Sequence, residues 1–193
     1  MSPMELPGPC PNVVPGMAPL AAILARTEET VVAVTGIRAY PSGFGFTLDL
    51  RLRGSVPREM RMHWPLPDVV SDSMRVLPAE AILRLTIEFA DGRSVSTADP
   101  GTAGPGEPDP DRPMLSNAPG TSWGADEWYR DAWCLALEYR VRPLPPPGPL
   151  AFVCEWPGRG ISSSRVEVDG ATIRQAADAA VTLWLDDPYC SHD

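Results

Sequence analysis

The chain has 193 residues, a hydrophobic content of 44% and a formal charge of −9, and all sixteen of its basic residues are arginine. This length and composition are typical of a globular domain with a well-filled core. Nucleic-acid binding is not expected, because a surface that neutralises phosphates needs clustered cations. No apolar run approaches the ~18 residues of a membrane-spanning helix, so a membrane partner is not expected either.

The cysteines and the first residues of the chain bear on its compartment. The N-terminus lacks a cationic region followed by an apolar one, so we expect no signal peptide and a cytoplasmic protein. In that compartment Cys10, Cys134, Cys154 and Cys190 are expected to be thiols. Their spacing contains no C-x-x-C pair, which argues against structural zinc. We expect no bound metal and no cofactor.

The first third of the chain predicts an arm followed by a β-hairpin. Residues 1–19 contain six prolines and little periodicity, which indicates an irregular arm. Residues 20–26 fit either a short helix or a strand. Residues 30–40 have apolar side chains at both odd-numbered and even-numbered positions. They predict a strand, but the pattern does not fix which face of it is buried. Residues 44–53 alternate between apolar and polar side chains and complete the hairpin.

The middle of the chain combines a second hairpin with two proline-rich connections. Residues 54–79 predict a long crossover, because four prolines break any element into short pieces. Residues 82–89 alternate and lead through Asp91-Gly92, the preferred chemistry of a tight turn, into a returning strand over 93–97. Residues 98–122 contain six prolines and four glycines, which predicts an exposed acidic loop.

Further strands and a rigid connector follow. Residues 128–142 alternate and place five large apolar side chains on one face, namely Trp133, Leu135, Leu137, Tyr139 and Val141. Residues 143–149 hold five prolines and predict a polyproline-like connector. Residues 150–156 predict a strand whose inward side chains are Leu150, Phe152, Cys154 and Trp156. Residues 165–169 predict one more short strand.

The last element has a helical period. Over residues 170–185 the apolar side chains form one stripe of an amphipathic helix, made by Ile173, Ala176, Ala177, Ala180, Val181 and Trp184. Asp169 is suited to cap the start of this helix, and Pro188 forbids its continuation.

Short strands separated by turns, with one late helix, predict a mainly β fold. We expect an antiparallel β-sandwich, immunoglobulin-like or jelly-roll-like, with one C-terminal amphipathic helix. The irregular arm would cover residues 1–19, a single sandwich domain residues 20–187, and a tail residues 188–193. No β-α-β alternation is present, which argues against a Rossmann-type nucleotide domain.

Several segments resemble a family of uncharacterised soluble proteins from GC-rich Gram-positive bacteria. The resemblance covers roughly residues 12–53 and 83–185, and its most specific part is the run PLPPPGPLAFVCEWP over residues 143–157. Residues 54–79 and the acidic loop depart from the pattern. The resemblance implies a soluble bacterial protein with no known activity, and it transfers no site residue.

The sequence offers few residues that are suited to catalysis or to metal binding. A nucleophile needs an adjacent base, and the two histidines, His63 and His192, lie in the crossover and near the C-terminal end. Cys154 should face the core and Cys134 the opposite side, which also argues against a disulfide between them. The acidic loop offers the oxygen ligands that calcium prefers, but it lacks the EF-hand pattern.

Outward carboxylates are a second catalytic possibility, because a pair of them is able to act as acid and base. On antiparallel strands, ion pairs with outward arginines are the commoner outcome. The carboxylates are Asp49, Glu88, Glu138 and Glu155, and the arginines are Arg51, Arg84, Arg140 and Arg142.

The aromatic cluster after the acidic loop is the most suggestive feature. Trp123, Trp128, Tyr129 and Arg130 combine the residue types that are enriched at protein contact surfaces, although the tryptophans also fit a lid on the sandwich. Acidic charge is concentrated in the loop and in residues 167–193, which carry a net −5 that would steer a basic partner.

These observations favour a non-enzymatic protein-interaction module that uses the aromatic cluster to bind an unidentified protein partner. Two alternatives stay open. One is a small hydrolase or ligand-binding β-sandwich that uses its surface carboxylates, and the other is a structural component of a bacterial assembly.

Overall fold

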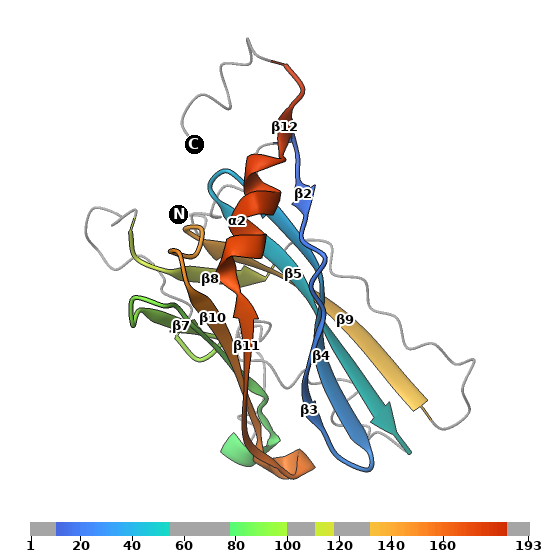
Figure 1. Cartoon of the computed structure of the whole chain (residues 1–193). Helices are drawn as coiled ribbons and strands as arrows, with labels where there is room; N and C mark the ends of the chain where they lie inside the picture. The colour runs from blue at the N-terminus through green and yellow to red at the C-terminus, as the bar shows by residue number, and fades with distance from the viewer. Residues whose placement is uncertain (1–10, 55–77, 100–110, 118–131, 185–193) are drawn as a thin grey trace, which may run out of the picture.

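The computed structural model describes residues 11–54, 78–99, 111–117 and 132–184. Two larger antiparallel sheets face each other, and one α-helix near the C-terminal end packs mainly against the larger of them, as Figure 1 shows. A third sheet of two strands pairs segments near the two ends of the described chain. The mainly β fold predicted from the alternating segments is therefore confirmed. Most of the crossover predicted over residues 54–79, namely residues 55–77, lies outside the described residues.

The larger sheet has the order β2-β4-β5-β9-β8, and β3 also pairs with β4. Its strands are β2 (Gly16–Met17), β3 (Ala22–Arg26), β4 (Thr30–Tyr40), β5 (Gly43–Arg53), β8 (Met114–Asn117) and β9 (Ala132–Arg142). Residues 20–26, which fitted helix or strand, thus contribute a strand. The predicted hairpin is the β4–β5 pair, in which Tyr40 lies opposite Gly43.

The smaller sheet has the order β11-β10-β6-β7. Its strands are β6 (Arg84–Glu88), β7 (Ser94–Ser96), β10 (Pro149–Trp156) and β11 (Ile161–Asp169). The predicted turn at Asp91-Gly92 joins β6 to β7, with Gly92 at a φ of 85° that favours glycine. Two short 3₁₀ turns flank this sheet, η2 (Ala79–Ala81) and η3 (Pro157–Arg159).

Aromatic side chains join the two sheets in the core. Phe46 of β5 meets Phe152 of β10 edge-on, with 5.5 Å between ring centroids, and stacks on Tyr139 of β9 at 5.6 Å. The alternating leucines of β5, β6 and β9 are equally buried, with Leu48, Leu85 and Leu137 at 0% exposure. Burial of these inward faces is the main stabilising contribution to a fold of this kind.

A β-bulge at Gly36 explains why β4 has apolar residues at both odd-numbered and even-numbered positions. The pairing of β4 with β5 shifts register between Thr35 and Arg38, and Gly36 has a φ of 58°. Before the bulge, even-numbered side chains such as Val34 are buried; after it, odd-numbered ones such as Ile37 are buried. The extra residue therefore keeps both halves of the strand facing the core.

The C-terminal helix is shorter than predicted. Helix α2 (Gly170–Asp178) starts where expected, with the Asp169 side chain accepting a hydrogen bond from the Ala171 amide at 2.9 Å. It ends well before residue 185, because the chain leaves the helix and forms strand β12 (Val181–Thr182) against β1 (Val13–Val14). Ile173 and Ala177 pack in the core as predicted, whereas Trp184 is 61% exposed.

Two segments that were predicted to be irregular contain short strands. Strands β1 and β2 lie within the arm assigned to residues 1–19, and β2 packs so closely on α2 that a Cβ at Gly16 would overlap the Ala176 carbonyl oxygen. Strand β8 lies within the predicted loop over residues 98–122, because Leu115 is apolar and becomes buried when β8 pairs with β9.

Within the described residues, no helix is both long enough and apolar enough to cross a membrane.

Candidate functional site

The predicted aromatic surface falls in a part of the chain that the structure does not describe. Trp123, Trp128, Tyr129 and Arg130 all lie in residues 118–131, outside the described ranges. Most of the acidic loop, both histidines, Cys10 and Cys190 are also outside them. The contact role assigned to this surface stays a prediction.

A different exposed apolar surface lies where the two ends of the described chain meet. Strands β1 and β12 pair antiparallel, with Val14 directly opposite Val181. We call β1, β12, Leu183 and Trp184 the terminal ribbon. It lies at the end of the molecule where α2 finishes, far from the tip of β3 (Figure 1).

Asn12 fixes the backbone of the terminal ribbon. Its side-chain amide donates to the Trp184 carbonyl oxygen at 2.6 Å, and its side-chain oxygen accepts from the Trp184 amide at 2.7 Å. The Leu183 amide also donates to the Asn12 carbonyl oxygen at 2.8 Å. Asn12 is only 1% exposed, so its polar groups need these partners. The ribbon is therefore held in a defined conformation.

The apolar side chains of the terminal ribbon face solvent. Val14 is 47% exposed, Val181 56%, Leu183 48% and Trp184 61%. Met17 of the neighbouring strand β2 is also exposed. A group of exposed apolar side chains on one element is more typical of an interaction site than single exposed apolar residues are. The sequence prediction missed this surface because it assigned Val181 and Trp184 to the buried stripe of a helix.

Outward carboxylates form ion pairs with arginines, although two of the partners differ from those predicted. Glu138 pairs with Arg38 of β4 at 2.8 Å, and Glu88 pairs with Arg165 of β11 at 3.1 Å. Glu167 shares Arg165 at 2.5 Å. The Arg38–Glu138 pair spans β5, and the Arg165–Glu88 pair spans β10, so each ties together two strands that lie on either side of a third.

The other two predicted carboxylates also lie beside polar partners. Asp49 accepts a hydrogen bond from the Thr35 hydroxyl at 2.5 Å and lies 3.8 Å from the predicted partner Arg51. Glu155 lies directly opposite Arg84 in the β10–β6 register. Trp156, the next residue, is buried, as its inward position predicted, and its indole donates to the Ala81 carbonyl oxygen at 3.1 Å. This arrangement gives the hydrolase alternative no added support.

The two strand cysteines occupy the opposite faces that the sequence predicted, and both are free thiols. Cys154 is fully buried, and burial together with the neighbouring Glu155 carboxylate raises the pKa of its thiol to about 12. Cys134 is half-buried on the outer face, where Arg51 Nη1 lies 3.6 Å from its sulfur. Cys154 is therefore protonated at neutral pH and unreactive.

Metal chemistry has no candidate in the described ranges. No group of three or more histidine, cysteine, aspartate or glutamate side chains in residues 11–54, 78–99, 111–117 and 132–184 is placed to hold an ion.

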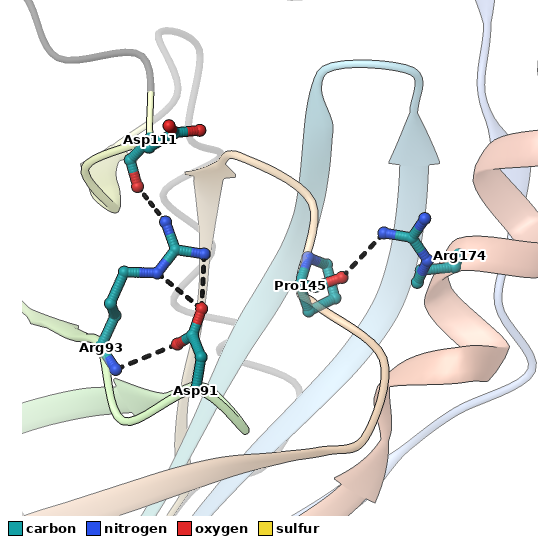
Figure 2. Close-up of polar contacts among 5 residues, drawn as sticks. All are labelled: Asp91, Arg93, Asp111, Pro145 and Arg174. Carbon is teal, nitrogen blue, oxygen red and sulfur yellow. Dashed lines mark hydrogen bonds and ion pairs between the residues drawn. The ribbon is translucent and has the colours of Figure 1, made fainter.

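Two arginines tie connecting segments to the sandwich, as Figure 2 shows. Arg93 binds the Asp91 carboxylate at 2.7 Å and donates to the Asp111 carbonyl oxygen, which links the β6–β7 turn to the approach to β8. Desolvation acts to raise the pKa of Asp91, but hydrogen bonds from Arg93 hold it below its ordinary value. Arg174 of α2 donates to the Pro145 carbonyl oxygen at 3.1 Å, so the proline-rich connector is fixed to the helix.

No family model, no curated protein and no solved structure matches the chain. The family resemblance drawn from the sequence stays a prediction.

Proposed function

We propose that the chain is a non-enzymatic protein-interaction module whose terminal ribbon binds a basic, amphipathic segment of another protein. The observation that carries the proposal is the exposure of Val14, Val181, Leu183 and Trp184 on a ribbon whose backbone Asn12 holds in place. A fixed apolar surface loses little conformational entropy on binding, which favours affinity. Tryptophan is also the residue type most enriched at energetically dominant contact positions.

The acidic composition of the C-terminal part of the sequence supports a basic partner. Residues 167–193 carry six carboxylates and one arginine, and Asp178 at the end of α2 is exposed. Cationic side chains flanking an apolar anchor would be attracted to this region, and the attraction would weaken with added salt. The aromatic cluster of Trp123, Trp128, Tyr129 and Arg130 is a second proposed contact surface of the same module.

The test is quantitative affinity capture from the native cell at two salt concentrations. The ribbon variant is Leu183→Ala/Trp184→Ala, which keeps the backbone hydrogen bonds to Asn12. The matched control is Ile23→Ala on β3, which removes a 51% exposed apolar side chain from the opposite end of the molecule. A third arm is Trp123→Ala/Trp128→Ala in the aromatic cluster.

We expect a specific partner with a basic, amphipathic segment whose recovery falls about tenfold or more in the ribbon variant, since dominant contacts of this type cost ≥ ~2 kcal/mol when truncated. Recovery with Ile23→Ala should equal that of the wild type. Loss only in the aromatic-cluster variant would move the docking site to that cluster. Self-association that depends on Trp184, measured by sedimentation, would make the occupant a second copy and overturn the basic partner.

A further inference from the structure

Helix α2 ends without a residue that would stop it. Its C-cap, Ala179, has a φ of −88° and a ψ of 0°, which is right-handed helical backbone. The Ala179 amide still donates to the Gln175 carbonyl oxygen at 3.2 Å, and the Ala180 amide donates to the Ala177 carbonyl oxygen at 3.1 Å. Helices commonly end at a glycine or asparagine in the left-handed region. Residues 179–187 contain no glycine, asparagine or proline.

The helical period of the sequence continues beyond this end. Counted from Ile173, the residues Ala180, Val181 and Trp184 stand seven, eight and eleven positions further on, which is the spacing of one helix face. Ile173 and Ala177 on that face are buried, and α2 packs on the larger sheet. A helix continued through residue 184 would therefore carry these three apolar side chains on its packed face.

The strand form of the same residues is held by few contacts. Strand β12 pairs with β1 over two residues only, and isolated two-stranded ribbons are marginally stable in water. Asn12 supplies the remaining hydrogen bonds, two of them from its side chain to the Trp184 backbone. Local sequence thus favours a helix, whereas cross-chain hydrogen bonds favour a strand, and a conflict of this kind brings two states close in free energy.

We propose that residues 179–184 are a conformational switch and that the terminal ribbon exists only in its strand state. In the helix state, α2 extends through residue 184, β1 loses its partner and the exposed apolar surface is removed. This inference rests on the proposed function, because it describes how the binding surface is formed. A partner that binds only the ribbon would shift the equilibrium toward the strand state by its differential affinity.

The test is NMR of the full chain, in which the Cα chemical shifts of residues 180–184 distinguish helix, strand and coil. Saturation-transfer experiments report the shifts of the less populated state as well. Asn12→Ala removes both side-chain hydrogen bonds to Trp184. Asn12→Ala/Ala179→Gly adds a residue that disfavours a continued helix, at an exposed position.

Two further variants complete the set. Thr182→Ala raises helix propensity at an exposed position of β12 and keeps Asn12, so it tests the switch even where Asn12→Ala does not fold. Ile23→Ala is the matched control, because it removes an exposed apolar side chain from β3, at the opposite end of the molecule.

We expect strand-like shifts in the wild type with a helical minor state. In Asn12→Ala the ratio of helix to strand should rise about fivefold or more, because two hydrogen bonds of the strand state are lost. Ala179→Gly should lower that ratio again by about fourfold, and Thr182→Ala should raise it about twofold. Ile23→Ala should leave it unchanged.

Partner capture with the same variants separates this inference from the proposed function. Recovery of the partner should fall in Asn12→Ala and be restored in Asn12→Ala/Ala179→Gly, although neither change alters the side chains of Val181 and Trp184. The NMR measurement needs no partner. A helical state without any captured partner would therefore contradict the proposed function and leave the switch intact.

Three results would overturn the switch. The first is coil-like shifts over residues 180–184 in Asn12→Ala, which would show that the segment frays and does not refold. The second is the absence of a helical state from both Asn12→Ala and Thr182→Ala. The third is a helical state whose population Ala179→Gly leaves unchanged.

Discussion

The buried position of Cys154 makes the stability of the fold depend on pH. Its thiol pKa rises from 9.0 to about 12, first because of burial and second because of the Glu155 carboxylate. The folded chain therefore holds this proton more tightly than the unfolded chain does. Below pH 9 both states are protonated, and between pH 9 and about 12 the unfolded state ionises first, so stability falls as pH rises through that window.

The variant Cys154→Val tests this dependence, since valine fills a similar volume without a titratable group. We expect the free energy of unfolding of the wild type to fall more steeply above pH 9 than that of the variant, by at most about 1.4 kcal/mol per pH unit. Urea unfolding at pH 7, 9 and 10.5 measures both slopes. Parallel slopes for the two proteins would show that the Cys154 thiol does not contribute.

For single residues, the alternation of apolar and polar side chains along β9 and β10 predicted that Cys154 points inward and Cys134 outward, because one face of each strand is buried. It did not predict that Arg38 pairs with Glu138 or that Arg165 pairs with Glu88. Each pair joins two strands that lie on either side of a third, so it depends on strand order, which is not encoded in the period of a single segment.

Among the elements, strand β12 is the clearest case in which tertiary contacts override local pattern. The spacing of Ala180, Val181 and Trp184 continues a helical stripe, but pairing with β1 and the Asn12 hydrogen bonds draws the chain out of the helix. A run of β-branched and aromatic residues before Pro188 was the available strand signal. Gly36 was a comparable signal for the bulge in β4, since an isolated glycine in a strand often marks one.

The hydrogen bonds of Asn12 make a prediction for the same element. In Asn12→Ala, amide hydrogen exchange over residues 13–14 and 181–184 should quicken about tenfold or more, because two hydrogen bonds worth ~0.5–1.5 kcal/mol each are lost. Asn12→Asp keeps the acceptor and loses the donor, so it should show an intermediate rate. Unchanged exchange in Asn12→Ala would mean that the ribbon is held by other contacts.

For the whole molecule, the sequence was sufficient to predict two facing sheets but not the surfaces that the sheets present. Phe46, Leu85 and Leu137 define the buried faces through their own alternation, whatever the strand order. The terminal ribbon needs residues 12 and 184 side by side, although they lie near opposite ends of the chain. This surface is therefore a consequence of topology, which no segment specifies alone.

The central claim is that the sandwich is a scaffold and that binding occurs at the terminal ribbon. The most direct test compares hydrogen exchange of the full chain alone and in complex with the partner recovered by affinity capture. We predict new protection over residues 13–17 and 181–184, with no change in β5 and β10. Protection confined to residues 118–131, or to the centre of either sheet, would contradict the claim.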